Sequence, residues 1–284
     1  MEVKKDMNIA VASGKGGTGK TTVATNLALS LGNVQFIDCD VEEPNANIFL
    51  KAKINESEDV NVNYPNIIKN KCNYCGKCSE FCAYNAIAVV PSKVLVFPEL
   101  CHSCLGCELV CPNDAIDWSN RSVGKIQHGR VNGIDFYQGV LNVGEIQAIP
   151  VIKSLKKRIK RDKNVIIDAP PGTSCPVIES INESDYCILV TEPTPFGFHD
   201  LKLAIEVVKH LKIQFGVIIN RDGIGDNRVE LYCQNENIPV LLKIPERKRI
   251  AYLYSKGISL VNESHEWHEM FGSVFDKIKL EVNK

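Results

Sequence analysis

The chain has 284 residues, of which 44% are hydrophobic and 24% are charged, and its formal net charge is −1. These values are typical of a globular protein with a buried core, and they give no electrostatic reason to expect a nucleic-acid or membrane partner. The apolar stretch at residues 7–12 is too short for a signal peptide, and no run approaches the roughly 20 apolar residues of a membrane span. We therefore expect a cytoplasmic protein with no nucleic-acid partner and no membrane association.

The first predicted strand, residues 7–13, leads into a glycine-rich loop and then a helical pattern at residues 21–31. The loop reads Gly-Lys-Gly-Gly-Thr-Gly-Lys-Thr, a Walker A sequence that turns backbone N–H groups toward nucleotide phosphates at a helix N-terminus. We expect Lys20 to reach the β- and γ-phosphates and Thr21 to ligate Mg²⁺. The predicted phosphate site consists of Gly14, Lys15, Gly16, Gly17, Thr18, Gly19, Lys20, Thr21 and Thr22.

Further along the chain, short apolar runs alternate with helical patterns. Strands are predicted at 33–38, 165–168, 186–191, 215–220 and 240–244, with helices at 200–211 and 248–256. Strands that are apolar throughout and separated by helices predict an α/β fold, here a P-loop NTPase with a mostly parallel sheet and helices on both faces. The sheet is expected to resume near residues 143–155 after an interruption that follows its second strand, and to lead there into a basic helix.

Two cysteine bursts with identical spacing cause that interruption. Each reads C-x2-C-x2-C-x3-C, the spacing of bacterial ferredoxins that bind [4Fe–4S] clusters. The second burst lies 29 residues after the first, and the residues that follow the last cysteine of each burst also match. We expect an ATPase domain formed by residues 1–59 and 121–284, interrupted at 60–120 by a small α+β ferredoxin-like domain.

In this motif the fourth cysteine of each burst ligates the other cluster. The predicted ligands of cluster one are Cys72, Cys75, Cys78 and Cys111, and those of cluster two are Cys101, Cys104, Cys107 and Cys82. Zinc is the alternative, because paired cysteines also bind zinc, but a tandem repeat of four cysteines favours iron. Disulfides are a second alternative, which the metal spacing and the lack of an export signal disfavour. The remaining four cysteines are expected to be small packed hydrophobes: Cys39, Cys175, Cys187 and Cys233.

With Lys15 at its second position, the loop resembles the deviant Walker A of the MinD/ParA/Mrp/nitrogenase-iron-protein ATPases. The resemblance covers the chain outside the cysteine segment and includes Asp38-Cys39-Asp40, Asp168-Ala169-Pro170-Pro171-Gly172 and Asn220-Arg221. It implies a homodimer closed around ATP, in which Lys15 of each chain contacts the partner's nucleotide. Cys175, which follows the second of these segments, is similar in position to cysteines that bridge a cluster between subunits in nitrogenase-like relatives; a packed thiol is the other interpretation.

The resemblance also implies a role for single residues. Asp40 would orient or activate the attacking water, with Asp38 close behind and able to assist at the Mg²⁺ hydration shell. Asp168 would be the Walker B carboxylate, Gly172 would offer its N–H to the γ-phosphate, and Asn220 would recognise the base. The predicted catalytic residues are Lys15, Lys20, Asp40 and Asp168, and the predicted magnesium ligands, direct or through water, are Thr21, Asp40 and Asp168. Guanine-specific relatives have an aspartate where Gly223 stands, so ATP is preferred over GTP.

Three functions fit these motifs. The first is an ATP-hydrolysing iron–sulfur protein that couples nucleotide state to electron transfer through two [4Fe–4S] clusters, with a redox protein as acceptor. The second is an ATP-dependent iron–sulfur cluster carrier that serves apo-proteins, as in Mrp-like relatives. The third is a regulatory or positioning switch like MinD. A C-terminal apolar stripe that includes Trp267 and Phe271 could serve membrane binding in the third case, but core packing is favoured.

Overall fold

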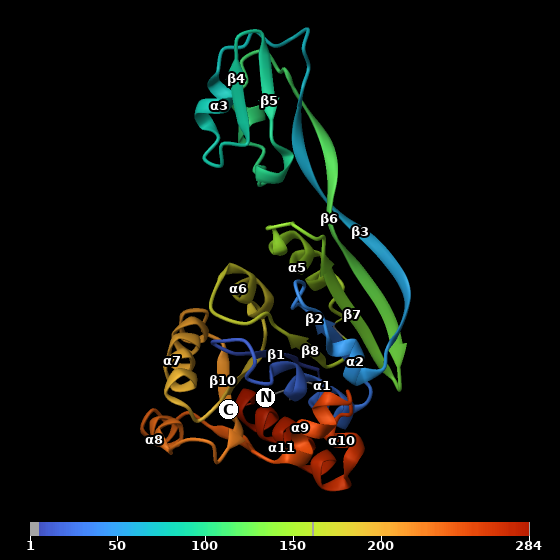
Figure 1. The fold of residues 1–284 in the computed structure, drawn as a ribbon, viewed down its shortest axis with the longest axis vertical. Coiled ribbons are helices and arrows are strands. Elements are labelled where there is room, and N and C mark those ends of the chain that lie inside the picture. Colours follow the sequence, from blue (N-terminus) through green and yellow to red (C-terminus); the bar gives the residue numbers. More distant parts are fainter. Residues whose placement is uncertain (1–5, 161, 284) are drawn as a thin grey trace.

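The computed structural model describes residues 6–160 and 162–283. Its centre is a sheet whose parallel strands run in the order β11-β10-β9-β1-β8-β2-β7 (Figure 1). Their bounds are β1 (Asn8–Ala12), β2 (Gln35–Asp38), β7 (Ile134–Leu141), β8 (Val165–Asp168), β9 (Tyr186–Thr191), β10 (Gln214–Asp222) and β11 (Val240–Pro245). Asp38 pairs with Asp168, and Val11 pairs with Asp168 on the other side. Both carboxylates therefore lie at the carboxyl edge of the sheet, beside the loop that follows β1.

Helices cover both faces of this sheet, and each face has its own apolar core. One face carries α5 (Ala148–Lys156), α6 (Cys175–Ile181), α7 (Pro195–His210) and α8 (Arg228–Asn235). The other carries α1 (Lys20–Leu31), α2 (Ala46–Leu50), α9 (Lys248–Ser255), α10 (Leu260–Glu263) and α11 (His265–Val282). The predicted α/β architecture, with a mainly parallel sheet between two helical layers, is confirmed. It follows from strands that are apolar on both sides.

The sheet resumes much earlier than the sequence suggested. β6 (Ile116–Val131) pairs antiparallel with β7, and β3 (Lys53–Ile67) pairs antiparallel with β6, which completes nine strands. Asn132 and Gly133, both at positive φ, make the tight turn between β6 and β7. The expected resumption near 143–155 was wrong, because most of that stretch forms α5. The many polar residues of β3 and β6 hide the strand pattern: β3 is largely exposed, and β6 is largely half-buried.

A β-bulge marks where β3 and β6 leave the sheet. The register shifts between Val60 and Asn61, which pair with Gly124 and Ser122, so Val123 is the extra residue. Its side chain is fully buried in the core beneath α5. Beyond the bulge, residues 61–67 and 116–122 pair only with each other and form a two-stranded ribbon. The limits predicted for the inserted domain, 60 and 120, fall inside these two strands and close to the bulge.

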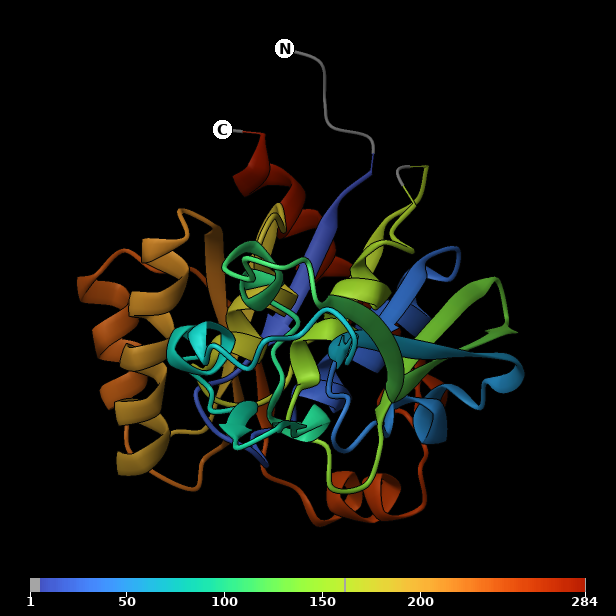
Figure 2. The ribbon, with the colours of Figure 1, turned by 90° about the horizontal axis from the view of Figure 1, so that it is seen from above.

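The ribbon carries a small body, residues 68–115, which we call the cysteine-rich unit. It consists of α3 (Lys77–Phe81), β4 (Ile87–Val90), β5 (Lys93–Val96), the 3₁₀ turn η1 (Pro98–Leu100) and α4 (Gly106–Leu109). Figure 1 shows the unit standing away from the sheet domain at the end of the crossing strands β3 and β6, and the view from above in Figure 2 shows it over the middle of that domain.

The C-terminal apolar stripe packs into the protein. Phe271, Val274, Phe275 and Ile278 of α11 are buried in the core on that face, so the interpretation as core packing is confirmed. The expected basic helix is α5, which ends at Lys156. No helix among the described residues is both long and apolar enough to cross a membrane.

Candidate nucleotide and cluster sites

The loop between β1 and α1 has the backbone that its glycines permit. Gly17 and Gly19 have φ of 79° and 95°, a left-handed conformation that other residues adopt only with strain. Lys20 begins α1 and is 6% exposed, and its Nζ lies 3.9 Å from Oδ2 of Asp40. The loop forms one wall of a cleft of about 510 Å³. Of the predicted nucleotide-site residues, those that line the cleft are Gly16, Gly17, Gly19, Lys20, Thr21, Thr22, Asp40 and Asn220.

Asp168 is fully buried next to this cleft. Neither carboxylate oxygen accepts a hydrogen bond of normal geometry among the described residues, although the Thr21 hydroxyl lies near enough to favour the charged form. Burial raises the pKa of Asp168 to about 6, against the opposing effects of Lys20 and Thr21. A buried carboxylate with free lone pairs close to Lys20 fits the ligand chemistry of Mg²⁺, which prefers carboxylate oxygens and water.

Asp38 does not share this property, although it also ends a buried strand. Its carboxylate accepts backbone hydrogen bonds from the N–H groups of Asp40 at 3.1 Å, Asn45 at 3.2 Å and Ala46 at 3.2 Å. These bonds fold the 38–46 loop around the carboxylate and place Asp40 at the cleft. The structure thus gives Asp38 a structural task in the loop, and its assistance at the Mg²⁺ hydration shell stays a prediction.

Two of the predicted nucleotide contacts already have partners in this chain. The Gly172 N–H donates to the carbonyl of Ser13 at 3.0 Å, and Gly172 has a φ of 93°. The Asn220 amide donates to the carbonyl of Thr18 at 2.7 Å and accepts from the Arg221 N–H at 2.9 Å. Asn220 therefore holds the phosphate loop. To contact a base, Asn220 would have to give up a hydrogen bond to this loop or to Arg221, and to contact a phosphate, Gly172 would have to give up its bond to Ser13. Their nucleotide-binding roles stay predictions.

Lys15 faces a residue that sequence reasoning left without a role. Its Nζ lies 3.4 Å from Glu192, whose side chain is 7% exposed and also pairs with Arg221 at 2.8 Å. Lys15 itself is about one-third exposed at the surface. The sequence did hold a signal for this contact: Glu192 directly follows strand β9, and that strand ends at the same sheet edge as the phosphate loop.

The far end of the cleft is apolar. Phe49, Ile250, Tyr254 and Leu260 line it, and the rings of Phe49 and Tyr254 lie 5.2 Å apart. These residues come from α2, α9 and α10, which are far apart in the sequence. A planar base fits such a wall, while the glycine loop at the other end suits phosphates.

In the cysteine-rich unit, the eight cysteines gather around two small cavities of about 20 Å³ each. Those at the first cavity are Cys72, Cys75, Cys78 and Cys111. Those at the second are Cys82, Cys101, Cys104 and Cys107. In each set, three cysteines come from one burst and the fourth from the other, as the sequence spacing predicted.

The internal repeat is visible in the backbone. Residues 29 positions apart share the left-handed conformation: Tyr74 with Ser103, Gly76 with Leu105 and Asn85 with Asp114. Hydrogen bonds from backbone N–H groups to cysteine sulfurs also recur at the same offset. The N–H of Ala86 donates to Sγ of Cys82, and that of Ala115 to Sγ of Cys111, both at 3.3 Å. N–H donors to sulfur stabilise a thiolate and tune any metal that it holds.

The sulfurs are spread around the cavities. Among the described residues, no group of three His, Cys, Asp or Glu side chains converges closely enough for a single metal ion. Burial, together with the neighbouring Cys101 and Cys104, raises the pKa of Cys107 to about 11. Eight thiols that surround two cavities without a disulfide fit a polynuclear cluster better than one closed zinc site.

The four other cysteines divide into two groups. Cys39, Cys187 and Cys233 are buried, as expected, but Cys175 at the first turn of α6 is exposed and not packed.

Comparisons with known proteins agree with this fold. A protein of Methanocaldococcus jannaschii named uncharacterized protein MJ0579 is 33% identical over 90% of this chain and 91% of its own length. An iron–sulfur cluster carrier protein of Pyrococcus abyssi is 24% identical over 92% of this chain and 81% of its own. The structure of the septum site-determining protein MinD with Mg-ADP from Pyrococcus horikoshii has a TM-score of 0.58 and 22% identity, over 96% of both chains.

Residues 9–261 match the family described as the CobQ/CobB/MinD/ParA nucleotide binding domain. The match includes β1, the phosphate loop, the acidic ends of β2 and β8, and the residues around the cleft. The chain therefore belongs to the CobQ/CobB/MinD/ParA family of nucleotide-binding P-loop domains.

Proposed function

We propose that this chain binds and hydrolyses Mg-ATP as a homodimer, and that it holds two [4Fe–4S] clusters whose electron transfer depends on nucleotide state. One observation carries the proposal. The two cavities of the cysteine-rich unit each have four thiols, exchanged between the bursts, and the unit is attached to the nucleotide-binding domain at the sheet edge that bears the phosphate loop.

At the nucleotide end, the chain supplies charge and orientation. Lys20 reaches into the cleft and neutralises phosphate charge, while Asp168 and Thr21 hold Mg²⁺. Asp40, which the bonds to Asp38 keep at the cleft, orients the attacking water. Lys15 exchanges Glu192 for the nucleotide of the partner chain when the dimer closes.

At the cluster end, the chain supplies thiolates, N–H donors and an apolar cover. When bound, the clusters store and pass single electrons, at potentials set by hydrogen bonds to sulfur and by solvent access. Ile67, Ile87, Ile116 and Trp118 form the cover over the cysteines. The acceptor is a redox protein.

Anaerobic purification followed by metal analysis tests the first half of the proposal. About eight iron atoms per chain are expected, with a [4Fe–4S] spectrum on reduction. Zinc at one or two atoms per chain would contradict it. The second half is tested by the rate of electron transfer from the reduced protein to an artificial acceptor, with and without Mg-ATP. Lys20→Ala is the control, because it should keep the iron and lose the effect of ATP.

A second function has its own support, since the relative from Pyrococcus abyssi is named an iron–sulfur cluster carrier protein. In that role the cluster is cargo, and ATP drives its transfer to an apo-protein. Incubation with an apo-ferredoxin discriminates between the two functions. Transfer of iron that Mg-ATP accelerates favours the carrier, and clusters that stay on the chain in the presence of ATP favour electron transfer.

A further inference from the structure

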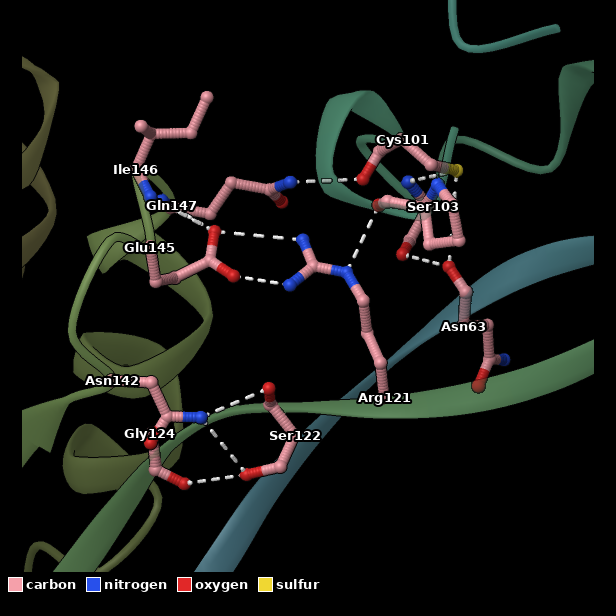
Figure 3. A network of polar contacts seen from close by, with 11 residues as sticks. Asn63, Cys101, Ser103, Arg121, Ser122, Gly124, Asn142, Glu145, Ile146 and Gln147 are labelled. Carbon is pink, nitrogen blue, oxygen red and sulfur yellow. Dashed lines mark hydrogen bonds and ion pairs between the residues drawn. The ribbon is translucent and has the colours of Figure 1, made fainter. Parts of the chain in front are cut away.

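A group of polar contacts joins the cysteine-rich unit to the sheet domain at one place (Figure 3). The Cys101 and Ser103 side chains contact the carbonyl of Asn63 on the ribbon. Three further side chains link the unit to the loop before α5, and we call them the tether: Arg121, Glu145 and Gln147. Arg121 lies on the ribbon, two residues from the bulge at Val123, and the other two lie on the loop between β7 and α5. The tether therefore bridges the point at which the ribbon leaves the sheet.

The tether holds the segment that contains Cys101. The Gln147 side-chain amide donates to the carbonyl of Cys101 at 2.9 Å, and this hydrogen bond is buried. Arg121 Nε donates to the carbonyl of Pro98 at 2.9 Å. Pro98 is the first residue of the turn η1 and Cys101 directly follows its last, so the tether holds both ends of the turn. Cys101 is one of the four thiols at the second cavity.

Glu145 organises the other two members. Its carboxylate forms an ion pair with Arg121 and accepts the N–H of Ile146 at 3.0 Å and of Gln147 at 2.9 Å. Burial opposes the charge, but Arg121 and the backbone donors outweigh it, and the pKa of Glu145 is lowered. A charged, part-buried carboxylate with this many donors fixes the position of the loop.

The same loop is attached to the nucleotide side. The N–H of Leu141, the last residue of β7, donates to the carbonyl of Val41 at 2.8 Å. Val41 is the residue that follows Asp40 in the chain. Asn142 then donates its N–H to the carbonyl of the bulge residue Val123 at 3.0 Å and its side-chain amide to Ser122 at 3.0 Å. Contacts thus run without a gap from Asp40, through Val41 and β7, to the tether.

The first cavity has no such attachment. The residue that corresponds to Cys101 in the repeat is Cys72, whose N–H donates to Ile68 inside the unit. Between residues 72–78 and the sheet domain, the described part of the chain shows no hydrogen bond or ion pair. The two halves of the repeat are therefore alike in their cysteines and different in their attachment.

We propose that Glu145, Gln147 and Arg121 are positioning residues for Cys101, and that they transmit the nucleotide state of the Asp40 loop to the second cavity and not to the first. This inference rests on the proposed coupling of nucleotide to clusters. Movement of the 38–46 loop displaces the end of β7 and the 142–147 loop, and with it the carbonyl of Cys101.

Hydrogen exchange of backbone amides tests the proposal in the full chain, with and without a non-hydrolysable Mg-ATP analogue. In the wild type, the analogue should change exchange at both 142–148 and 98–105. Gln147→Met has a similar length but cannot donate to Cys101. It should speed exchange at 98–105 about fivefold, the effect of one lost hydrogen bond, and should remove the response of 98–105 while keeping that of 142–148. Glu99→Gln, an exposed change in the same turn, is the matched control and should behave as the wild type.

A second readout is the midpoint potential of each cluster in the loaded protein, followed by electron paramagnetic resonance. The analogue should shift one potential in the wild type and in Glu99→Gln, and neither in Gln147→Met. A response at 98–105 that survives in Gln147→Met, or that is missing in the wild type, overturns the tether. If the exchange results are as expected but no potential moves in the wild type, the tether stands and the coupling to electron transfer fails.

Discussion

Asp38 and Asp168 show how the same residue type at the same sheet edge takes two roles. They lie opposite each other on β2 and β8, and both are fully buried. Three backbone N–H groups bind Asp38, whereas no backbone N–H among the described residues binds either carboxylate oxygen of Asp168. The sequence predicted Asp168 as a magnesium ligand and Asp38 as an assistant at the hydration shell. It did not predict the backbone hydrogen bonds of Asp38, because these arise from how the 38–46 loop folds back.

The raised pKa of Asp168 predicts a pH-dependent stability. Because its folded-state pKa of about 6 exceeds the ordinary 3.8, the folded protein retains a proton that the unfolded chain has released, and stability falls as the pH rises through this window. Without nucleotide, Asp168→Asn should be more stable than the wild type at pH 7.5 by about 2–3 kcal/mol. The difference should vanish near pH 4. Chemical denaturation over this pH range measures it.

Two comparisons check that the buried charge of Asp168 causes this pH dependence. Asp276→Asn, an exposed change on α11, should show no such pH dependence. With Mg-ATP bound, the wild type should be more stable than Asp168→Asn, since it has a magnesium ligand that this variant lacks. A stability difference for Asp168→Asn that stays constant from pH 4 to 7.5 would rule out the buried charge as its origin.

Lys15 carries a prediction about assembly. In the single chain it pairs with Glu192, and in the proposed dimer it leaves that partner for the neighbouring nucleotide. Lys15→Gln should bind Mg-ATP through Lys20 but should not dimerise, as measured by sedimentation with a non-hydrolysable analogue. Hydrolysis should fall at least tenfold, as expected for the loss of one charged contact worth about 1.5–3 kcal/mol. A dimer that forms as readily as in the wild type would exclude this role.

At the scale of elements, the apolar strands were predictable and the polar ones were not. The runs that became β1, β2, β8, β9, β10 and β11 are buried on both faces, and their hydrophobicity showed in the sequence. β3 is exposed over much of its length and β6 is largely half-buried with many polar residues, so both lack that signal. The tether was not predictable either, because its members are brought together by the bulge at Val123 and not by any motif.

The repeat offers a test of the cysteine loops. Gly76 has a φ of 83°, and its repeat partner Leu105 has a φ of 62°. A Cβ at Gly76 would meet only Glu80, at 3.9 Å, so Gly76→Ala tests backbone strain without a clash. We expect a loss of about 1 kcal/mol and faster loss of iron from the first site.

The matched control is Gly272→Ala in α11, where an added Cβ meets nothing within 4 Å. It should stabilise the protein, because alanine favours a helix by up to about 1 kcal/mol over glycine. Thermal unfolding and the rate of iron release to a chelator measure both variants. Equal effects of the two substitutions would show that the loop conformation at Gly76 is not what holds the cysteines in place.

At the scale of the whole molecule, two sites share one edge of one sheet. The cleft and the cysteine-rich unit lie far apart in sequence and are linked by the 38–46 loop, β7 and the tether. The motifs predicted both sites and the exchange of cysteines between the bursts, since these depend on local spacing. The connection between the two sites depends on tertiary contacts, which the structure shows and the motifs do not predict.

The most direct measurement of the central claim is the affinity of the chain for a non-hydrolysable Mg-ATP analogue in the oxidised and the reduced protein. Coupling between two sites is reciprocal, so if nucleotide shifts a cluster potential, reduction must shift nucleotide affinity by the same free energy. A one-electron shift of about 30 mV corresponds to an affinity change of about threefold. We predict at least this difference in the wild type and its loss in Gln147→Met. Equal affinities in the oxidised and reduced wild-type protein would contradict the account.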